Sequence, residues 1–306
     1  MVTQMDFAAV NAFIQAAELK SFTAAAARLD VTASGISKAV ARLEAYVGVR
    51  LMNRTTRSLS LTPDGVAFLQ RCRNALSELE DAREMLARTG AEPRGILRMS
   101  MPLAYGRLLI IPKLSELLER YPALSIEANI SDRRADLIEE GYDLAIRIGE
   151  LPDTRLIARR IDIAKFVVCA SPHYLQRAGR PKSPYDLAQH ACVVSRSASD
   201  GRVLAWRLPT ATGEPFETVP RSRLVVDNGE ALIDAAVSGA GLIYIHRYMV
   251  KANLEAGSLE TVLETDERDA VPVYAIYPQT KSLSPKVRAV VDHLVSTLQP
   301  QPQPRE

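Results

Sequence analysis

Cysteine and tryptophan are scarce in this sequence. Its 306 residues include three cysteines, Cys72, Cys169 and Cys192, and a single tryptophan, Trp206. A small and odd number of cysteines argues against a disulfide framework and for a reducing compartment. We therefore expect Cys169 and Cys192 to be buried structural thiols, with a redox-sensing pair as the alternative, and Trp206 to be a core aromatic residue.

Long apolar runs and the common catalytic patterns are also missing. No apolar run reaches about 18 residues and residues 1–10 lack the features of a signal peptide, so we expect a cytoplasmic protein without a membrane partner. The four histidines have no paired metal-ligand spacing, and no G-x-S-x-G motif occurs. Gly239-Ala240-Gly241 precedes a strand-like run instead of following one, unlike a dinucleotide-binding loop. These absences predict a protein that is not an enzyme and uses no metal or cofactor.

Net charge is small but unevenly distributed. Lys and Arg number 38 and Asp and Glu 36, which gives a formal charge of +2. Residues 1–62 hold seven basic and four acidic side chains, whereas residues 95–306 are neutral as a whole. At about 150 residues per domain, the length indicates two domains. The excess positive charge belongs to the first of them.

The first 50 residues have the pattern of three short helices. Apolar residues recur at helical spacing in residues 7–17, and two further helical segments follow, over 24–29 and up to about Tyr46. The candidate N-cap residues are Ser21 or Thr23 for the second helix and Thr32 or Ser34 for the third. On the third helix an apolar stripe of Ile36, Val40 and Leu43 leaves the other face polar and cationic.

A hairpin and a long helix come next. Residues 50–61 alternate like two short strands around an arginine-rich turn. Thr62 followed by Pro63 is a typical helix start, and no breaker occurs until about Arg88. The helix carries a heptad seam of Cys72, Leu79 and Leu86. Such a seam favours pairing with a second helix.

Two helices joined by a tight turn and followed by a hairpin indicate a winged helix-turn-helix. A helix in the major groove of DNA needs small polar side chains for base edges and Lys or Arg for phosphates, and a hairpin beside it suits backbone contacts. The alternative is a plain helical hairpin with a solvated polar face. The residues expected to contact DNA are Thr23, Thr32, Ala33, Ser34, Ser37, Lys38, Arg42, Asn53, Arg54, Thr55 and Arg57.

The chain changes character after a hinge at residues 89–95, where Gly and Pro end the long helix. Strand-like and helix-like segments then alternate, which is the α/β pattern. The expected strands are residues 96–101, 124–130, 144–148, 166–170, 224–226, 242–245 and 271–276. The expected helices are residues 106–120, 133–140, 229–238 and 286–297.

A ligand site is expected beyond the carboxyl ends of these strands, where helix N-termini attract anions. Arg147 alternates with apolar neighbours and is a candidate for an anionic group, with a bridge to a nearby carboxylate as the alternative. The strand-end candidates are Ser100, Met101, Pro102, Ser131, Asp227 and Asn228. For Ser131, Asp227 and Asn228 the alternative is an ordinary helix cap.

Several motifs together resemble a known family. They are Ser21-Phe22-Thr23-Ala24-Ala25-Ala26, Val31-Thr32-Ala33-Ser34-Gly35-Ile36-Ser37-Lys38, Arg42-Leu43-Glu44, Gly48-Val49-Arg50-Leu51, Asn53-Arg54-Thr55-Thr56-Arg57 and Leu61-Thr62. In this order they are similar to the winged helix-turn-helix of LysR-type transcriptional regulators. The segments that resemble the effector domain of that family are Gly95-Ile96-Leu97-Arg98, Asp143-Leu144-Ala145-Ile146-Arg147-Ile148-Gly149 and Pro285-Lys286-Val287-Arg288. One departure is Ala33, where many members carry a larger polar residue or proline.

The resemblance implies a mainly α winged helix-turn-helix domain at residues 1–62, a dimerising linker helix at 63–90 and an α/β effector domain at 91–298. The effector domain would have two subdomains with a ligand cleft between them, as in type 2 periplasmic solute-binding proteins. Residues 299–306 are rich in Pro and Gln and are expected to form a disordered tail.

The expected function is sequence-specific DNA binding in transcriptional regulation, controlled by a small effector. The expected partners are double-stranded DNA with an interrupted inverted repeat, a small-molecule effector, and RNA polymerase. The strand-end sites favour an anionic effector. The chain is also expected to associate with further copies of itself as a homodimer or homotetramer. The alternative is a cytoplasmic small-molecule-binding protein or enzyme whose N-terminal helices only mediate protein contacts. The missing catalytic motifs and signal peptide weigh against it.

Overall fold

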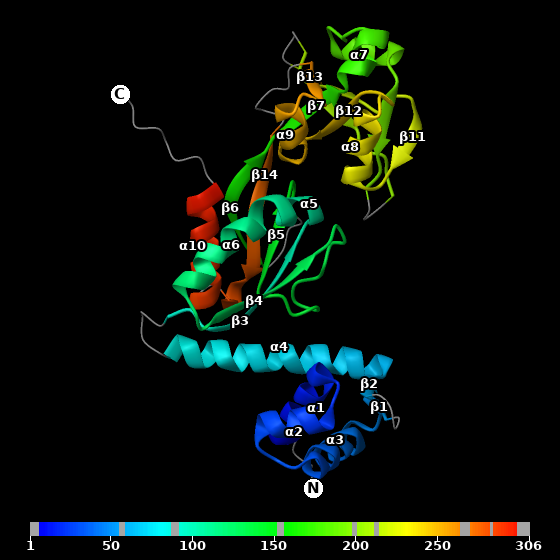
Figure 1. Cartoon of the computed structure of the whole chain (residues 1–306). Helices are drawn as coiled ribbons and strands as arrows, with labels where there is room; N and C mark the ends of the chain where they lie inside the picture. Colours follow the sequence, from blue (N-terminus) through cyan, green and yellow to red (C-terminus); the bar gives the residue numbers. More distant parts are fainter. Residues whose placement is uncertain are drawn as a thin grey trace, which may run out of the picture. The chain divides into compact units, whose positions relative to one another are not determined.

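In the computed structural model the chain forms two compact units, residues 1–91 with 138–141, and residues 92–137 with 142–306 (Figure 1). The structure describes residues 6–54, 59–86, 92–151, 156–197, 201–210, 214–263, 270–281 and 284–298. The turn of the expected hairpin, residues 89–91 of the expected hinge and the expected tail lie outside these ranges.

The first unit contains the helices and the hairpin expected from the sequence. Its elements are α1 (Phe7–Leu19), α2 (Phe22–Leu29), α3 (Ala33–Val47), β1 (Met52–Arg54), β2 (Leu59–Leu61) and α4 (Pro63–Leu86). β1 and β2 pair antiparallel. The apolar stripe of α3 is buried in the core that the three short helices share.

Hydroxyl side chains start three of these helices. Ser21 Oγ accepts a hydrogen bond from the Ala24 amide at 3.2 Å, and Thr32 Oγ1 accepts one from the Gly35 amide at 3.0 Å. Of the two candidates for each helix, Ser21 and Thr32 are therefore the N-caps. Thr62 caps α4 in the same way, at 2.9 Å, as expected.

The hairpin is fixed to the helices on either side of it. Glu44 on α3 accepts hydrogen bonds from the Leu51 and Met52 amides through one oxygen, Oε1, at 2.9 and 3.0 Å. At Gly65 on α4, a Cβ atom would lie 1.9 Å from the Leu51 carbonyl oxygen. Only glycine allows so close an approach, so the sequence fixes the base of the hairpin between α3 and α4.

The heptad seam of α4 is only partly available to a partner. Cys72 is buried in the core of the first unit, and the ring of Phe68 lies 5.7 Å from that of Phe13 on α1. Leu79 is 54% exposed, and the side chain of Leu86 lies outside the part that the structure describes. The prediction of one continuous free seam was therefore wrong at Cys72, because α4 uses its first turns to complete the core.

A five-stranded sheet forms the first subdomain of the second unit. Its strand order is β4-β3-β5-β14-β6; β4 and β5 run parallel to β3, and β14 is antiparallel to β5 and β6. The strands are β3 (Gly95–Met101), β4 (Leu124–Ile130), β5 (Leu144–Ile148), β6 (Leu156–Ala164) and β14 (Val271–Pro278). α6 (Ile111–Arg120) and α10 (Pro285–Leu298) pack against each other over this sheet (Figure 1).

The second subdomain begins where Lys165 separates β6 from the next strand. Its elements are β7 (Phe166–Ala170), α7 (Pro172–Ala178), β8 (Cys192–Ser195), β9 (Trp206–Leu208), β10 (Phe216–Thr218), β11 (Ser222–Val226), α8 (Gly229–Val237), β12 (Ile243–His246), α9 (Arg247–Glu255) and β13 (Glu260–Val262). A 3-10 turn covers Pro184–Gln189, and another, Gln279–Lys281, follows β14 in the first subdomain. β7 pairs with β12 and β13, and β8 with β11. Trp206 is buried, as expected.

The α/β architecture with two subdomains is confirmed, but two expected helices need correction. Residues 133–136 are irregular and residues 137–140 form a turn, where a helix was expected. The Ala135 carbonyl accepts a hydrogen bond from the Arg147 guanidinium at 3.1 Å, and the Leu137 carbonyl accepts one from the Tyr142 amide at 2.9 Å. The first of these hydrogen bonds is tertiary and the second spans five residues, so neither belongs to the regular backbone hydrogen bonds, each spanning four residues, of an α-helix. The segment expected as one helix at 106–120 contains a π-helical turn over Gly106–Ile110.

Candidate functional site

The outer face of α3 is polar and cationic, as the sequence predicts. Its apolar stripe is buried, and Ala33 and Ser37 are half-buried. The candidate DNA contacts with exposed side chains on α2 and α3 are Thr23, Thr32, Ser34, Lys38 and Arg42. α3 therefore combines one buried face with a face of hydroxyl and cationic groups at the surface of the first unit.

Two of these side chains already have partners within the unit. The Thr32 hydroxyl accepts the Gly35 amide proton and keeps its own proton for donation. Arg42 lies 3.6 Å from the Asp6 carboxylate, and the two side chains are 72% and 50% exposed. An ion pair this exposed contributes little to stability, so Arg42 remains available to a phosphate group.

The hairpin is described only in part. Asn53 on β1 is exposed. Arg54 ends β1, but its side chain lies outside the described residues, as do Thr55 and Arg57. The contacts expected of these three residues stay predictions.

Four of the expected ligand residues meet at the ends of β3, β4 and β5. The Ser131 amide donates to the Met101 carbonyl at 3.0 Å, so the ends of β3 and β4 are adjacent. From β5, Arg147 Nη1 lies 3.4 Å from Ser100 Oγ and 2.9 Å from the Ile146 carbonyl. The structure therefore brings Ser100, Met101, Ser131 and Arg147 together, with Ser100 buried.

The other candidates lie at the starts of α5 (Leu103–Tyr105) and α8. Pro102 is half-buried and precedes α5, and Asp227 is exposed and precedes Asn228, the N-cap of α8. An ion pair between Arg107 and Glu230 joins the π-helical turn of the first subdomain to the first turn of α8. Residues 227–228 therefore lie at the boundary between the two subdomains.

Both helix N-termini that were expected to attract an anion are already capped. Asp132 Oδ1 accepts a hydrogen bond from the Leu103 amide at 2.9 Å, at the start of α5. Asn228 Oδ1 accepts one from the Glu230 amide, also at 2.9 Å, at the start of α8. The helix-cap alternative is thus correct for Asn228. A negatively charged effector would have to be met by a side chain such as Arg147 and not by these amides.

Aromatic rings cross the boundary between the subdomains, a feature that the sequence did not reveal. We call this set the aromatic column; its members in order are Tyr244, Phe166, His246, Tyr248 and Tyr105. Successive ring centroids are 4.5, 3.9, 5.4 and 5.2 Å apart. Tyr244, His246 and Tyr248 are neighbours in the sequence, but Phe166 and Tyr105 come from distant segments, so no local pattern could have predicted the whole column.

Burial perturbs the titratable members of the aromatic column. His246 Nδ1 is buried and has no hydrogen-bond partner among the described residues, and burial lowers the pKa of His246 to about 4. Burial also raises the pKa of Tyr105, with a further contribution from its hydrogen bond to Asp162 Oδ2 at 2.7 Å. At neutral pH the column is therefore uncharged.

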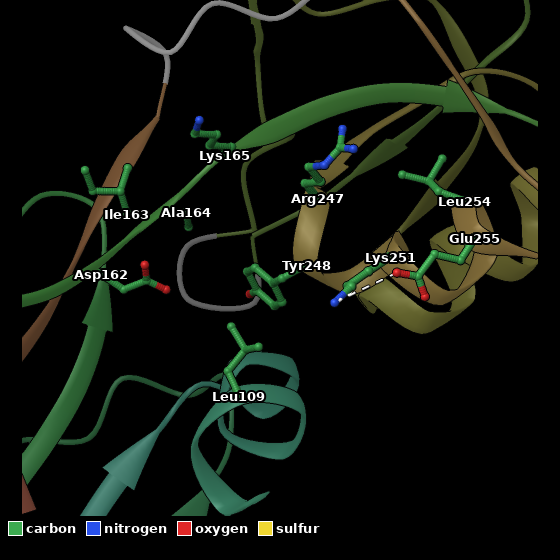
Figure 2. Close-up of a pocket in the computed structure, with 10 residues that line it drawn as sticks. All are labelled: Leu109, Asp162, Ile163, Ala164, Lys165, Arg247, Tyr248, Lys251, Leu254 and Glu255. Carbon is green, nitrogen blue, oxygen red and sulfur yellow. Dashed lines mark ion pairs between the residues drawn. The ribbon is translucent and has the colours of Figure 1, made fainter. Parts of the chain in front are cut away.

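A cavity of about 350 Å³ lies beside Tyr248, the fourth ring of the column (Figure 2). Its lining residues are Leu109, Asp162, Ile163, Ala164, Lys165, Arg247, Tyr248, Lys251, Leu254 and Glu255. None of the seven expected ligand residues is among them. The sequence interpretation missed this cavity because it did not include α9, which supplies half of the wall.

The cysteines fit a structural role. All three are free and buried, as expected for Cys169 and Cys192. Cys169 and Cys192 pack in separate apolar clusters, and burial raises the pKa of each thiol to about 12. The reactive thiolate is therefore scarce at neutral pH.

Among the described residues, no group of three or more His, Cys, Asp or Glu side chains is placed to share a metal ion. Within the same part of the chain, no helix has the length and apolarity needed to cross a membrane.

The two parts of the chain match two models of one family. Residues 7–66 match the bacterial regulatory helix-turn-helix protein of the lysR family, and residues 90–299 match the LysR substrate binding domain. The chain therefore belongs to the LysR family of transcriptional regulators, which join a DNA-binding helix-turn-helix to an effector-binding domain.

Relatives along nearly the whole chain agree. The chain is 33% identical over 291 residues to YhjC of Escherichia coli (strain K12), an uncharacterized HTH-type transcriptional regulator, covering 95% of this chain and 97% of that one. It is also 33% identical over 285 residues to the HTH-type transcriptional activator AaeR of the same strain, covering 93% and 91%. Among solved structures, it is similar to CrgA, a LysR-type regulator from Neisseria meningitidis, with a TM-score of 0.58, 31% identity and coverage of 96% and 99%. The predicted class of function, a DNA-binding transcriptional regulator with an effector-binding domain, is confirmed.

Proposed function

We propose that this regulator reads DNA with α3 and the hairpin, and that two copies joined through α4 bind an interrupted inverted repeat. The observation that carries the proposal is the outer face of α3, where Ser34, Lys38 and Arg42 are exposed above a buried apolar stripe. Small polar groups suit base edges and the cations suit phosphates. A symmetric dimer requires a symmetric operator.

The proposed division of the chain follows from this role. Residues 1–62 bind DNA, residues 63–90 form the dimerising linker, residues 91–298 bind the effector and residues 299–306 are a tail. Dimers associate into tetramers on DNA, and RNA polymerase is the protein that the bound regulator acts on. The activity is regulatory and not enzymatic, and the protein works in the cytoplasm.

We further propose that the effector binds among Ser100, Met101, Pro102, Ser131, Arg147, Asp227 and Asn228. Support comes from the hydrogen bonds at the strand ends, which join Arg147 to Ser100 and Ser131 to Met101. The Arg107–Glu230 ion pair supports it as well, because it brings α8 to the same boundary. A ligand that contacts both subdomains changes their relative orientation, and this change would pass to the DNA-binding units.

Fluorescence anisotropy with labelled DNA from upstream of the protein's own gene tests the DNA-binding role. We expect tight, salt-sensitive binding to this DNA and weaker binding to unrelated DNA. Arg54→Ala should weaken binding to both DNAs alike and reduce the salt slope by about 1, because its contact is to phosphate. Lys182→Ala, which removes an exposed charge in the effector domain, is the control and should change neither value.

Two results would count against these roles. A change in sequence preference with an unchanged salt slope in Arg54→Ala would show that the arginine reads bases. Absence of salt-sensitive, site-specific binding in the unmodified protein would favour a small-molecule-binding protein whose N-terminal helices mediate protein contacts.

A further inference from the structure

The cavity beside Tyr248 has the size and lining of a small-molecule site. Its volume of about 350 Å³ falls in the range of about 300–1,000 Å³ that is typical of ligand pockets. Leu109, Ile163, Ala164 and Leu254 give it an apolar wall, and Figure 2 shows Leu109 opposite the strand that carries Asp162 and Ile163. An apolar ligand body would find aliphatic contacts on several sides.

Positive charge exceeds negative charge around this wall. The cations are Lys165, Arg247 and Lys251, and the carboxylates are Asp162 and Glu255. Both carboxylates are engaged, since Asp162 accepts the Tyr105 hydroxyl proton at 2.7 Å and Glu255 lies 3.9 Å from Lys251 (Figure 2). In the part of the chain that the structure describes, the Arg247 guanidinium has neither an ion pair nor a hydrogen bond.

The N-terminus of α9 adds to the positive charge around the cavity. The Arg247 amide donates to the Lys165 carbonyl at 2.8 Å, which holds the two cationic residues next to each other. His246, the N-cap, makes no side-chain capping bond to α9, in contrast to Asn228 on α8. The positive end of the α9 dipole is therefore not neutralised by a capping side chain.

We propose that this cavity is a second ligand site, separate from the strand-end site, for a small organic monoanion with an apolar body. Arg247 and Lys165 would hold the anionic head, and Leu109, Ile163 and Leu254 the apolar body. The π-helical turn and β6 supply one wall and α9 the other. A ligand here would therefore contact both subdomains at once.

Isothermal titration calorimetry of the full chain with octanoate and with its neutral analogue octanamide tests the proposal. Octanoate should bind, and octanamide should bind at least about tenfold more weakly because it lacks the charge. Arg247→Gln should weaken octanoate binding about tenfold. Lys182→Gln, which removes an exposed charge of the same subdomain outside the cavity, should leave the octanoate affinity unchanged.

Several outcomes would overturn the second site. No binding of octanoate to the unmodified protein, or equal affinities for octanoate and octanamide, would do so. Loss of octanoate binding in Arg147→Gln with full binding in Arg247→Gln would place the ligand in the strand-end site instead. Leu254→Gln provides an independent check of the apolar wall, since it should weaken octanoate binding while circular dichroism shows an intact fold. DNA binding is measured separately, so failure here leaves the proposed DNA-binding role untouched.

Discussion

The carboxylate of Asp143 joins three separate elements of the second unit. Its oxygens lie 3.2 Å from Lys281 Nζ in the last 3-10 turn and 3.7 Å from Lys286 Nζ in α10, and one accepts the Arg98 amide of β3 at 2.9 Å. Asp143, Lys281 and Lys286 are all buried. A buried charge is tolerated only when it is paired and hydrogen-bonded. The 3-10 turn and α10 are thus fixed to β3 by electrostatics as well as by apolar packing.

We expect Asp143→Asn to destabilise the protein by about 3–5 kcal/mol, because two buried ammonium groups lose their counter-charge. Urea unfolding of the purified protein measures the loss. Glu127→Gln is the control, since Glu127 is 56% exposed in its pair with Arg98 and should cost less than about 1 kcal/mol. Equal losses in the two variants would contradict this account.

Thr32 offers a second test at the residue scale. Thr32→Ala removes the N-cap of α3 and should cost about 1 kcal/mol of stability in the first unit. Ser34→Ala is the matched control, because Ser34 is exposed and is not the cap. Hydrogen exchange at the Gly35 amide, which donates to Thr32, should speed up in the first variant only. Unchanged exchange in Thr32→Ala would show that the cap does not protect this turn.

At the scale of elements, the local apolar pattern predicted the bounds of several strands well. The strands expected at 124–130, 144–148 and 166–170 have the bounds of β4, β5 and β7, because continuous or alternating apolar runs define them. β6 was missed because the adjacent Arg159 and Arg160 interrupt its apolar pattern, whereas β4, the other edge strand, alternates apolar and polar residues along its whole length. α9 was missed because only Val250 of its nine residues is buried, which leaves almost no periodic signal.

A prediction at the scale of elements concerns the seam of α4. Leu79→Asp should weaken self-association and DNA binding together, because Leu79 is 54% exposed beyond the part of the seam that serves the core. Sedimentation velocity measures the first effect and anisotropy the second. Val66→Asp is the matched control, since Val66 is a 58% exposed apolar residue of the same helix outside the seam. Sedimentation of Leu79→Asp like that of the unmodified protein would refute the role of the seam.

At the scale of the whole molecule, the sequence could show which residues belong to the strand ends but not what surrounds them. Ser100, Ser131 and Arg147 were identified because each follows or interrupts an apolar run. The cap on α8 was among the sequence alternatives, because Asn228 directly precedes the helix. The cap on α5 could not be predicted, since Asp132 reaches Leu103 across 29 residues of chain. The cavity beside Tyr248 depends on three segments that only the fold brings together.

The pH dependence of stability follows from His246 in the aromatic column. Its pKa of about 4 in the folded protein is below the value of about 6.5 for the unfolded chain, which therefore binds the proton first as the pH falls. The contribution of neutral His246 to the free energy of unfolding is complete above about pH 6.5 and decreases towards pH 4. Between pH 7 and pH 5 this loss should be about 2 kcal/mol. His246→Phe keeps a ring in the column and should lose about 2 kcal/mol less over this interval in urea unfolding. Identical losses in both proteins would show that His246 does not titrate in this way.

Trp206 gives the molecule an optical property of its own. It is the single tryptophan of the chain, it is buried, and its ring lies 5.7 Å from that of Tyr244, the first member of the aromatic column. All tryptophan emission therefore comes from the second subdomain of the effector domain, at one end of a stack that reaches the first. The helix-turn-helix contributes no tryptophan emission, although Tyr46 lies on α3. Fluorescence excited at wavelengths that only tryptophan absorbs therefore reports on the ligand-binding half alone, even while the other half is bound to DNA.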